Sequence, residues 1–586
     1  MNMKKIGLIL LFFFTFIVLS YPAPVSAQAI DPQYLFIRKS PMHCIPDCTY
    51  LWNFDYPQNI NTATMLDIIN LVGTRGGDQR KLGIGVEINY NSVYDFTRIK
   101  QSLQNLLLES KTNNIPVYIN LGGFQWWGVN TVGDGWNGRP DLWNWWDSTK
   151  AGYNLNNKNN VEWTCWDNSC ATNKAWRNWG GGDFEVRPHP NLASRAFIDS
   201  SKTKLAELVP IIVNWYTSLP FDKKWLLGGI SNGTETDIGG NYRVYGNNDI
   251  PFEQDPSNPI KQLGYAAVKT AGLRSSGNPP TVAELNEVIS RYTNELDKFV
   301  FDQGIPRSKI FNHIGGSDIY AGTFPQGVNY PTTAGALTKY GAPGWSFYGD
   351  VTTNPQNFAG LTTTLNQINN SEWTSPEWFT YATDYNGWVG ALKNSLNYRN
   401  NRFINISNWE DHVRPNSIAL SAIKTVLNEI PTCWVSAPMV QSVTVQENTV
   451  NFTWQKGNYD HVYLLISTTS DFDIDGILTN KNVAQNVATN LTTYTKSGLA
   501  PGKYYWQFVA DGCVDPQYRW QTRTIDGSFT ISSPSPTPAP LPGDFTETGD
   551  TEGDHVNIYD YNLLVSKFNN PYTIFDYNDL VANYGR

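Results

Sequence analysis

Over residues 31–435, short apolar runs alternate with stretches in which apolar residues recur at helical spacing. Eight runs, bounded by turn residues, have the length of buried strands: Thr49–Phe54, Lys81–Ile88, Pro116–Leu121, Trp225–Ile230, Lys309–His313, Trp345–Tyr348, Trp378–Thr383 and Arg402–Ile406. Amphipathic helices are expected at Lys202–Leu219, at Ser417–Ile430 and after Thr281, where Glu284 completes a capping box. This alternation predicts a (β/α)8 TIM barrel over 30–435, in the α/β class. A doubly wound sheet is the alternative, but no Gly-rich phosphate fingerprint follows an early strand.

The pattern changes at residue 436. Short runs with period-two alternation, such as Val450–Trp454 and Tyr504–Val509, continue to residue 531 and are separated by turn residues. They predict an all-β, immunoglobulin-like sandwich over 436–531. Trp454 on an early strand, and Leu499-Ala-Pro-Gly-Lys-Tyr-Tyr-Trp506 entering a late one, resemble a fibronectin type III module.

A proline-rich segment, 532–542, separates this sandwich from a tail, 543–586, and is expected to be an extended linker. The tail contains a repeat at a spacing of 16 residues: Val556–Val565 matches Tyr572–Val581. The repeat resembles a type I dockerin, a small α-helical module related to the EF-hand that docks onto a cohesin partner. The resemblance implies one Ca²⁺, because only the first copy is rich in acids. Its ligands would be Asp550, Glu552, Asp554, Asn557 and Asp560. A helical hairpin without metal is the alternative.

The first 29 residues have the pattern of a signal peptide. Lys4 and Lys5 precede an apolar run to Leu19, which is followed by small residues suited to cleavage. We therefore expect a secreted, extracellular protein that can be attached to a cell surface, with no membrane span after cleavage. The six cysteines suit export as disulfides, and their spacing suggests three pairs: Cys44 with Cys48, Cys165 with Cys170, and Cys433 with Cys513.

The amino-acid composition reduces the number of plausible function classes. The chain has 43 Lys+Arg and 52 Asp+Glu residues, for a net charge of −9, which argues against a nucleic-acid binder. Aromatic residues make up 14%, and ten of the 22 tryptophans lie between Trp126 and Trp179. Loops normally contain few large apolar residues. These tryptophans are expected to form stacking platforms for a carbohydrate polymer, a satellite core, or both.

In a barrel of this type, catalytic groups project from the C-terminal ends of the strands. Carboxylates occur at several predicted ends, which suits glycoside hydrolysis by two carboxyl groups without a catalytic cofactor. Glu235, after the fourth strand, is the candidate acid/base, and Asp384 or Glu410 is the candidate partner. Glu377 ranks lower because it precedes the predicted seventh strand. The candidate substrate-binding residues are Glu87, Trp126, Trp127, Asn232, His313, Trp345, Tyr348 and Trp409.

At Glu235 and Trp409 the chain resembles the clan-A glycoside hydrolases, which pair carboxylates after the fourth and seventh strands and often have Trp after the eighth. Two positions depart from that pattern: Thr234 replaces the usual Asn before the acid, and the predicted seventh strand offers Asp384 instead of Glu. Over residues 80–410 the chain is also similar to a group of secreted barrels without an assigned substrate. The matching stretches are Asn160–Trp163, Trp176–Gly180, Pro188–Asn191 and Pro343–Tyr348.

The resemblance implies a secreted glycoside hydrolase. The alternative is a non-catalytic carbohydrate-binding or surface-assembly protein whose barrel has lost one carboxylate. A protease is not supported, because neither Gly-x-Ser-x-Gly nor His-Glu-x-x-His occurs.

Overall fold

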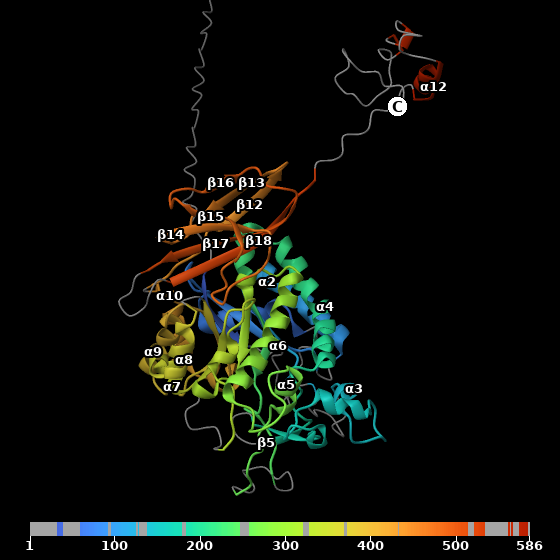
Figure 1. Cartoon of the computed structure of the whole chain (residues 1–586). Coiled ribbons are helices and arrows are strands. Elements are labelled where there is room, and N and C mark those ends of the chain that lie inside the picture. The colour runs from blue at the N-terminus through green and yellow to red at the C-terminus, as the bar shows by residue number, and fades with distance from the viewer. Residues whose placement is uncertain are drawn as a thin grey trace, which may run out of the picture. The chain divides into compact units, whose positions relative to one another are not determined.

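The computed structural model (Figure 1) describes a defined part of the chain. The described residues are 32–38, 59–91, 95–124, 127, 138–178, 183–246, 257–319, 327–368, 372–431, 433–513, 521–533, 561–562, 564–565 and 574–583. The predicted signal peptide, Cys44 and Cys48, most of the linker and the predicted calcium ligands lie outside them. Within the described residues, no helix is both long and apolar enough to cross a bilayer.

Eight parallel strands form the predicted closed barrel, in the order β1-β11-β10-β9-β8-β6-β3-β2. They are β1 (Gln33–Arg38), β2 (Arg80–Asn89), β3 (Val117–Gly122), β6 (Leu227–Thr236), β8 (Ile310–Ile314), β9 (Gly344–Tyr348), β10 (Trp373–Phe379) and β11 (Asn401–Ile406).

Two strand predictions were wrong. The first strand is β1, which pairs with both β11 and β2 and closes the barrel, whereas the predicted Thr49–Phe54 lies outside the described residues. The seventh strand is β10, which ends at Phe379 instead of Thr383. Pro376 sits inside β10, where the pairing register with both neighbouring strands shifts. Because such irregularities tolerate a residue without an N–H donor, proline does not interrupt this strand.

Helices follow most of the strands. Five of these helices pack against one another in the order α10, α1, α2, α4, α6. The capping box predicted at Thr281 and Glu284 is present at the start of α6. The main helices are α1 (Thr62–Val72), α2 (Phe96–Asn113), α4 (Arg195–Ser218), α5 (Tyr265–Thr270), α6 (Val282–Asp302), α8 (Ala359–Asn366), α9 (Tyr385–Asn397) and α10 (Ser417–Asn428); α3 (Pro140–Trp143) and α7 (Asp350–Thr353) are single turns.

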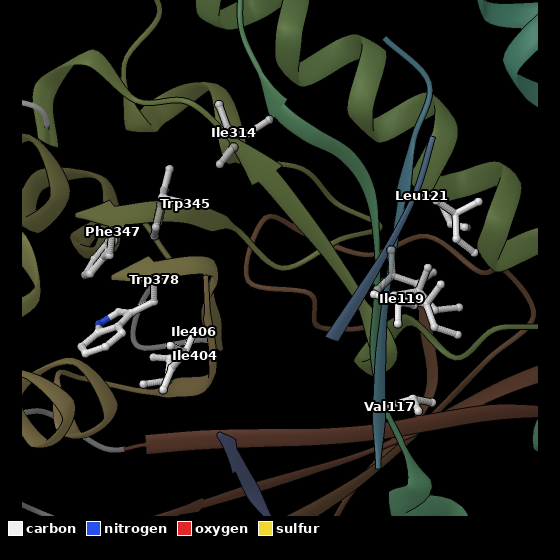
Figure 2. Packing of buried hydrophobic residues seen from close by; sticks show 14 of the residues in the cluster. Val117, Ile119, Leu121, Ile314, Trp345, Phe347, Trp378, Ile404 and Ile406 are labelled. Atoms are coloured by element: carbon white, nitrogen blue, oxygen red, sulfur yellow. The ribbon is translucent and has the colours of Figure 1, made fainter. Parts of the chain in front are cut away.

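Alternation along the strands separates two cores. Val117, Ile119 and Leu121 of β3 belong to the large cluster between strands and helices, part of which Figure 2 shows. The intervening Tyr118 joins a second cluster inside the barrel, with Tyr34, Phe36, Phe311, Ala342 and Phe403. Gly228 leaves room for this second cluster, because a Cβ atom at position 228 would lie 2.2 Å from the Phe36 ring. Aromatic rings therefore fill the barrel interior below the C-terminal ends of its strands.

After the barrel, two antiparallel sheets form the predicted β domain. One has the order β12 (Met439–Gln446), β13 (Thr449–Gln455), β16 (Thr493–Lys496); the other has β15 (Lys481–Val487), β14 (His461–Ser467), β17 (Gly502–Gly512), β18 (Gln521–Ile531). The chain up to Val443, with Asn451–Tyr494 and Tyr504–Phe529, forms one compact unit; the second comprises Thr444–Val450, Thr495–Lys503 and Thr530–Arg586, including α12 (Ile574–Asn583). Two predicted disulfides are present, Cys165–Cys170 and Cys433–Cys513.

Candidate active site

Glu235 lies at the C-terminal end of β6, where the strand departs from regular geometry. The pairing of β6 with β8 shifts register between Asn232 and Thr236. Gly233 and Glu235 have φ values of 103° and 44°. A positive φ is uncommon for a residue other than glycine and costs about 1–3 kcal/mol. The strained backbone of Glu235 is therefore an independent sign that its position is functional.

Glu377 of β10 faces the same space. One carboxylate oxygen of Glu235, one of Glu377 and one ring nitrogen of His313 all lie within 4.8 Å of one another, and all three residues are buried. The β9–β10 pairing places Glu377 opposite Ser346, and the β2–β3 pairing places Glu87 opposite Asn120. The sequence prediction ranked Glu377 below Asp384 and Glu410 because it placed the seventh strand too late.

Arg38, the last residue of β1, connects two carboxylates. Its guanidinium donates to Glu377 through one nitrogen and to Glu87 through the other. The Asn89 amide also donates to Glu87, at 3.0 Å. Burial lowers the pKa of Arg38, but the nearby carboxylates of Glu377 and Glu87 more than offset this, so its pKa is raised above its ordinary value.

A chain of hydrogen bonds supports Glu235 from the other side. The Asn120 amide donates to His313 Nδ1 at 3.0 Å, and His313 Nε2 lies 2.8 Å from Ser346 Oγ. The Ser346 hydroxyl donates to Glu235 Oε1 at 2.8 Å. Burial lowers the pKa of His313 well below its ordinary value, so the ring is neutral and carries its hydrogen on Nε2. Each donor in this chain meets an acceptor, which fixes the orientation of Glu235.

The two carboxyls differ in their partners. Burial raises the pKa of both, that of Glu377 to about 7. Arg38 opposes this rise directly at Glu377 through an ion pair, whereas Glu235 receives hydrogen bonds from two neutral groups, Ser346 and Asn241. Two buried carboxyls this close repel each other as anions, which favours a single proton shared between them. The ion pair with Arg38 favours the ionised form of Glu377 relative to that of Glu235.

A small sheet, β5 (Asp183–Val186), β4 (Ala175–Asn178) and β7 (Tyr242–Arg243), comes from the loops after β3 and β6. Arg177 of this sheet is buried and lies 5.0 Å from the Tyr242 ring. Burial raises the pKa of Glu235 and raises that of Asp237 to about 6, and the Arg177 guanidinium opposes both rises. The Asn241 side chain donates to Glu235 Oε2 at 3.0 Å, and its backbone N–H donates to Asp237 at 3.1 Å. These loops therefore position Glu235 and adjust its charge.

Glu235, His313 and Glu377 have the donor types and spacing of a metal site. Their hydrogen bonding does not fit one. His313 Nδ1 accepts from Asn120, so Nε2 carries a hydrogen and offers no lone pair. The guanidinium of Arg38 already neutralises Glu377. A cation would have to displace both interactions.

The structure does not bring the predicted partners of Glu235 to it. Asp384 is exposed and caps α9 by accepting from the Gly387 N–H at 2.9 Å. Glu410 is half-buried in the turn after β11 and forms an ion pair with Arg414 at 3.2 Å. Both carboxylates thus have local structural partners.

The predicted substrate-binding residues divide into two groups. Glu87, His313 and Tyr348 belong to the site, the last through a hydrogen bond that lowers the pKa of Glu377. The others that are described are buried: Asn232 donates to Asp297, and three tryptophans belong to the core between strands and helices, namely Trp127, Trp345 and Trp409. Trp126 lies outside the described residues.

The tryptophan-rich loop forms mainly a satellite core. Of the ten tryptophans between 126 and 179, seven are described, and each of these is buried or half-buried. Trp143 stacks on Trp146 with ring centroids 5.5 Å apart, and Trp166 packs edge-on against Tyr265 at 4.9 Å.

Four residues of the site had not been predicted from the sequence: Arg38, Asn120, Ser346 and Asn241. The one sequence signal available for them was a polar residue at or near the end of an apolar run.

Comparison with known proteins gives a limited result. No known family profile and no curated protein matches the chain. Among solved structures, the catalytic domain of a β-amylase from Paenibacillus polymyxa is 12% identical, with a TM-score of 0.37, covering 68% of this chain and 98% of that one. A modular endo-β-1,4-mannanase from Cellulomonas fimi is 10% identical, with a TM-score of 0.31, covering 86% and 94%. Likenesses this weak carry no functional inference, so function has to be inferred from the site.

Proposed function

We propose that the barrel is a retaining glycoside hydrolase that acts on a carbohydrate polymer. The observation that carries this proposal is the buried pair Glu235 and Glu377, whose nearest oxygens lie within 4.8 Å. Carboxyl groups about 5–5.5 Å apart suit a retaining mechanism, whereas inverting enzymes need roughly 6.5–9.5 Å to admit a water between them. The resemblance to clan-A enzymes supports the same pairing, now that the seventh strand is known to carry a glutamate.

The roles follow from the partners of each carboxyl. Glu377, held ionised by Arg38, would attack the anomeric carbon and form a covalent glycosyl-enzyme. Glu235, carrying the proton, would donate it to the leaving oxygen. After departure of the leaving group, Glu235 as carboxylate would take a proton from water, which hydrolyses the intermediate with net retention. The neutral His313 and Ser346 would hold Glu235 in place through both steps.

Conservative replacement of each carboxyl tests the proposal. Glu235→Gln and Glu377→Gln keep the shape of each side chain but remove the proton donor or the nucleophile. Hydrolysis of any polysaccharide that the wild type degrades should fall by about 10²–10⁴-fold or more. Asp384→Asn is the matched control and should retain activity, because Asp384 caps a helix on the surface. If both Gln variants retained full activity, or if Asp384→Asn alone were inactive, the pair would be wrong.

The alternative is a non-catalytic carbohydrate-binding barrel, which the departure from the clan pattern at Thr234 favours. Thr234 is buried, and its hydroxyl donates to Asn120 Oδ1 at 3.3 Å. Binding of a polysaccharide by the wild type without release of reducing ends would support this alternative.

We further propose that the protein is exported and that its remaining modules attach it to a partner. The two disulfides are compatible with an extracellular location. The three-stranded and four-stranded sheets are compatible with a fibronectin type III-like sandwich.

The tail is proposed to be a dockerin-like module that binds one Ca²⁺ and a cohesin-type partner. Equivalent positions of its repeat have nearly equal exposure. Leu564 and Leu580 are both 1% exposed, whereas Val565 and Val581 are 56% and 57% exposed. Tyr561 and Tyr577 are each 40% exposed. This symmetry supports two equivalent segments, each with a buried leucine and an outward-facing apolar pair suited to docking.

A further inference from the structure

A cavity of about 40 Å³ lies at the N-terminal end of the barrel strands, opposite the candidate active site. Its lining comes from the segments before β6 and β8, from the first residues of β11, and from β18 and the chain leading into β12. All the residues that line it belong to one compact unit. A water molecule needs roughly 10–15 Å³ of such space, so the cavity has room for a small anion.

The lining of the cavity is positively charged. Lys224, Lys309 and Arg402 contribute cations, and Tyr216, Ser308 and Thr524 contribute hydroxyls. No acidic residue is among the described residues that line it. Three cations around one small space repel one another unless an anion lies between them.

The nearest carboxylates are engaged elsewhere. Asp526 accepts hydrogen bonds from the backbone N–H groups of Arg307 and Ser308, at 2.8 and 2.9 Å. Glu372 lies 3.8 Å from Arg402 but is shared with Arg523, at 3.6 Å. Around the cavity, the buried cations Lys309, Arg402 and Arg523 therefore outnumber the buried carboxylates Glu372 and Asp526.

Lys309 is the residue that most requires a ligand. Its side chain is buried, and within the described part of the chain no hydrogen bond or ion pair holds its ammonium group. Burial lowers its pKa to about 8, so at neutral pH it remains largely charged. Glu372 and Asp526 attract this buried charge without forming an ion pair with it, so a bound anion would stabilise it further.

We propose that this cavity is a binding site for one small inorganic oxyanion, such as phosphate or sulfate, held by Lys309 and Arg402 with the hydroxyl of Thr524. Several oxygens on one centre match this mixture of ammonium, guanidinium and hydroxyl donors better than a single-atom anion does. The site lies away from Glu235 and Glu377 and does not depend on the function proposed for them.

Equilibrium dialysis of the full chain against radiolabelled inorganic phosphate, at constant ionic strength and neutral pH, tests the proposal. We expect saturable binding at a stoichiometry near one, with competition by sulfate but much weaker competition by chloride. Lys309→Met should weaken binding about tenfold or more, because it removes a charged donor. Lys111→Met is the matched control: it removes the same charge from an exposed position near the end of α2 and should bind phosphate like the wild type.

Thr524→Val keeps every charge and should also weaken phosphate binding. It therefore tests the proposal even if Lys309→Met fails to fold. Three results would overturn the proposal: no binding by the wild type at millimolar phosphate, displacement of phosphate by chloride as effectively as by sulfate, or unchanged affinity in folded Lys309→Met.

Discussion

Arg38 is the cation that most strongly opposes the raised pKa of Glu377. Its guanidinium lies between Glu377 and Glu87, whereas Glu235 is held by the neutral groups Ser346 and Asn241. The sequence singled out Glu235, Glu87 and His313 because each lies at the end of a recognisable apolar run. Arg38 was missed and Glu377 was ranked too low, because their roles depend on where β1 and β10 begin and end, which a composition pattern alone does not establish.

The pH dependence of activity should report this arrangement. Glu377 must be ionised to act, and burial raises its pKa to about 7 even beside Arg38. Arg38→Gln removes the opposing cation, so the pKa of Glu377 should rise further. The acidic limb of the pH profile of kcat/KM should then move to higher pH by about 1 unit or more.

Ser346→Ala is the complementary variant for that experiment. Ser346 lowers the pKa of Glu235 by donating to it, so its loss should raise that pKa and extend activity at the alkaline limb. If Arg38→Gln left the acidic limb unchanged, Arg38 would not control the ionisation of Glu377.

At the scale of elements, the barrel was predictable because buried parallel strands are continuous apolar runs. The predicted Lys81–Ile88, Pro116–Leu121 and Arg402–Ile406 all fall within or next to observed strands. The prediction failed at β10, where Pro376 and a register shift interrupt the pattern. The carboxylate pairing was lost with that strand, since a register error moves side chains to the other face.

Close packing inside the barrel gives a prediction about its glycines. Gly228→Ala would place a Cβ 2.2 Å from the Phe36 ring, so it should lower the free energy of unfolding by about 1–3 kcal/mol. Gly390→Ala, in α9 with nothing within 4 Å of the added carbon, should be neutral or stabilise by about 0.5–1 kcal/mol. Denaturant unfolding of both variants would measure this. Equal effects would mean that the aromatic layer is not tightly packed.

At the scale of the whole molecule, composition changes along the sequence predicted the order of a barrel, a β domain and a repeat-containing tail. The closed barrel and two later antiparallel sheets are observed. The ligand set of the tail, from Asp550 to Asp560, lies outside the described residues and stays a prediction. The charged cavity at the N-terminal end of the barrel could not be predicted, because Lys309, Arg402 and Thr524 meet only in the folded chain.

Calorimetric titration of the full chain with Ca²⁺ tests the tail. We expect one ion per chain, because clustered carboxylates repel one another until a hard cation binds between them. Asp554→Ala should abolish that binding, whereas Asp384→Ala, which removes an exposed carboxylate from the barrel, should not. A stoichiometry near two, or no binding at millimolar calcium, would contradict the proposed site.

The central claim, that Glu377 is the nucleophile opposite Glu235, is tested most directly by azide rescue. Glu377→Gly should be inactive on a dinitrophenyl glycoside of the sugar that the wild type releases, since the leaving group needs no acid but the nucleophile is missing. Added azide should restore turnover and give a glycosyl azide of inverted anomeric configuration, whereas Glu235→Gly with azide should give the retained product. Absence of rescue in Glu377→Gly, or an inverted azide from Asp384→Gly instead, would contradict the assignment.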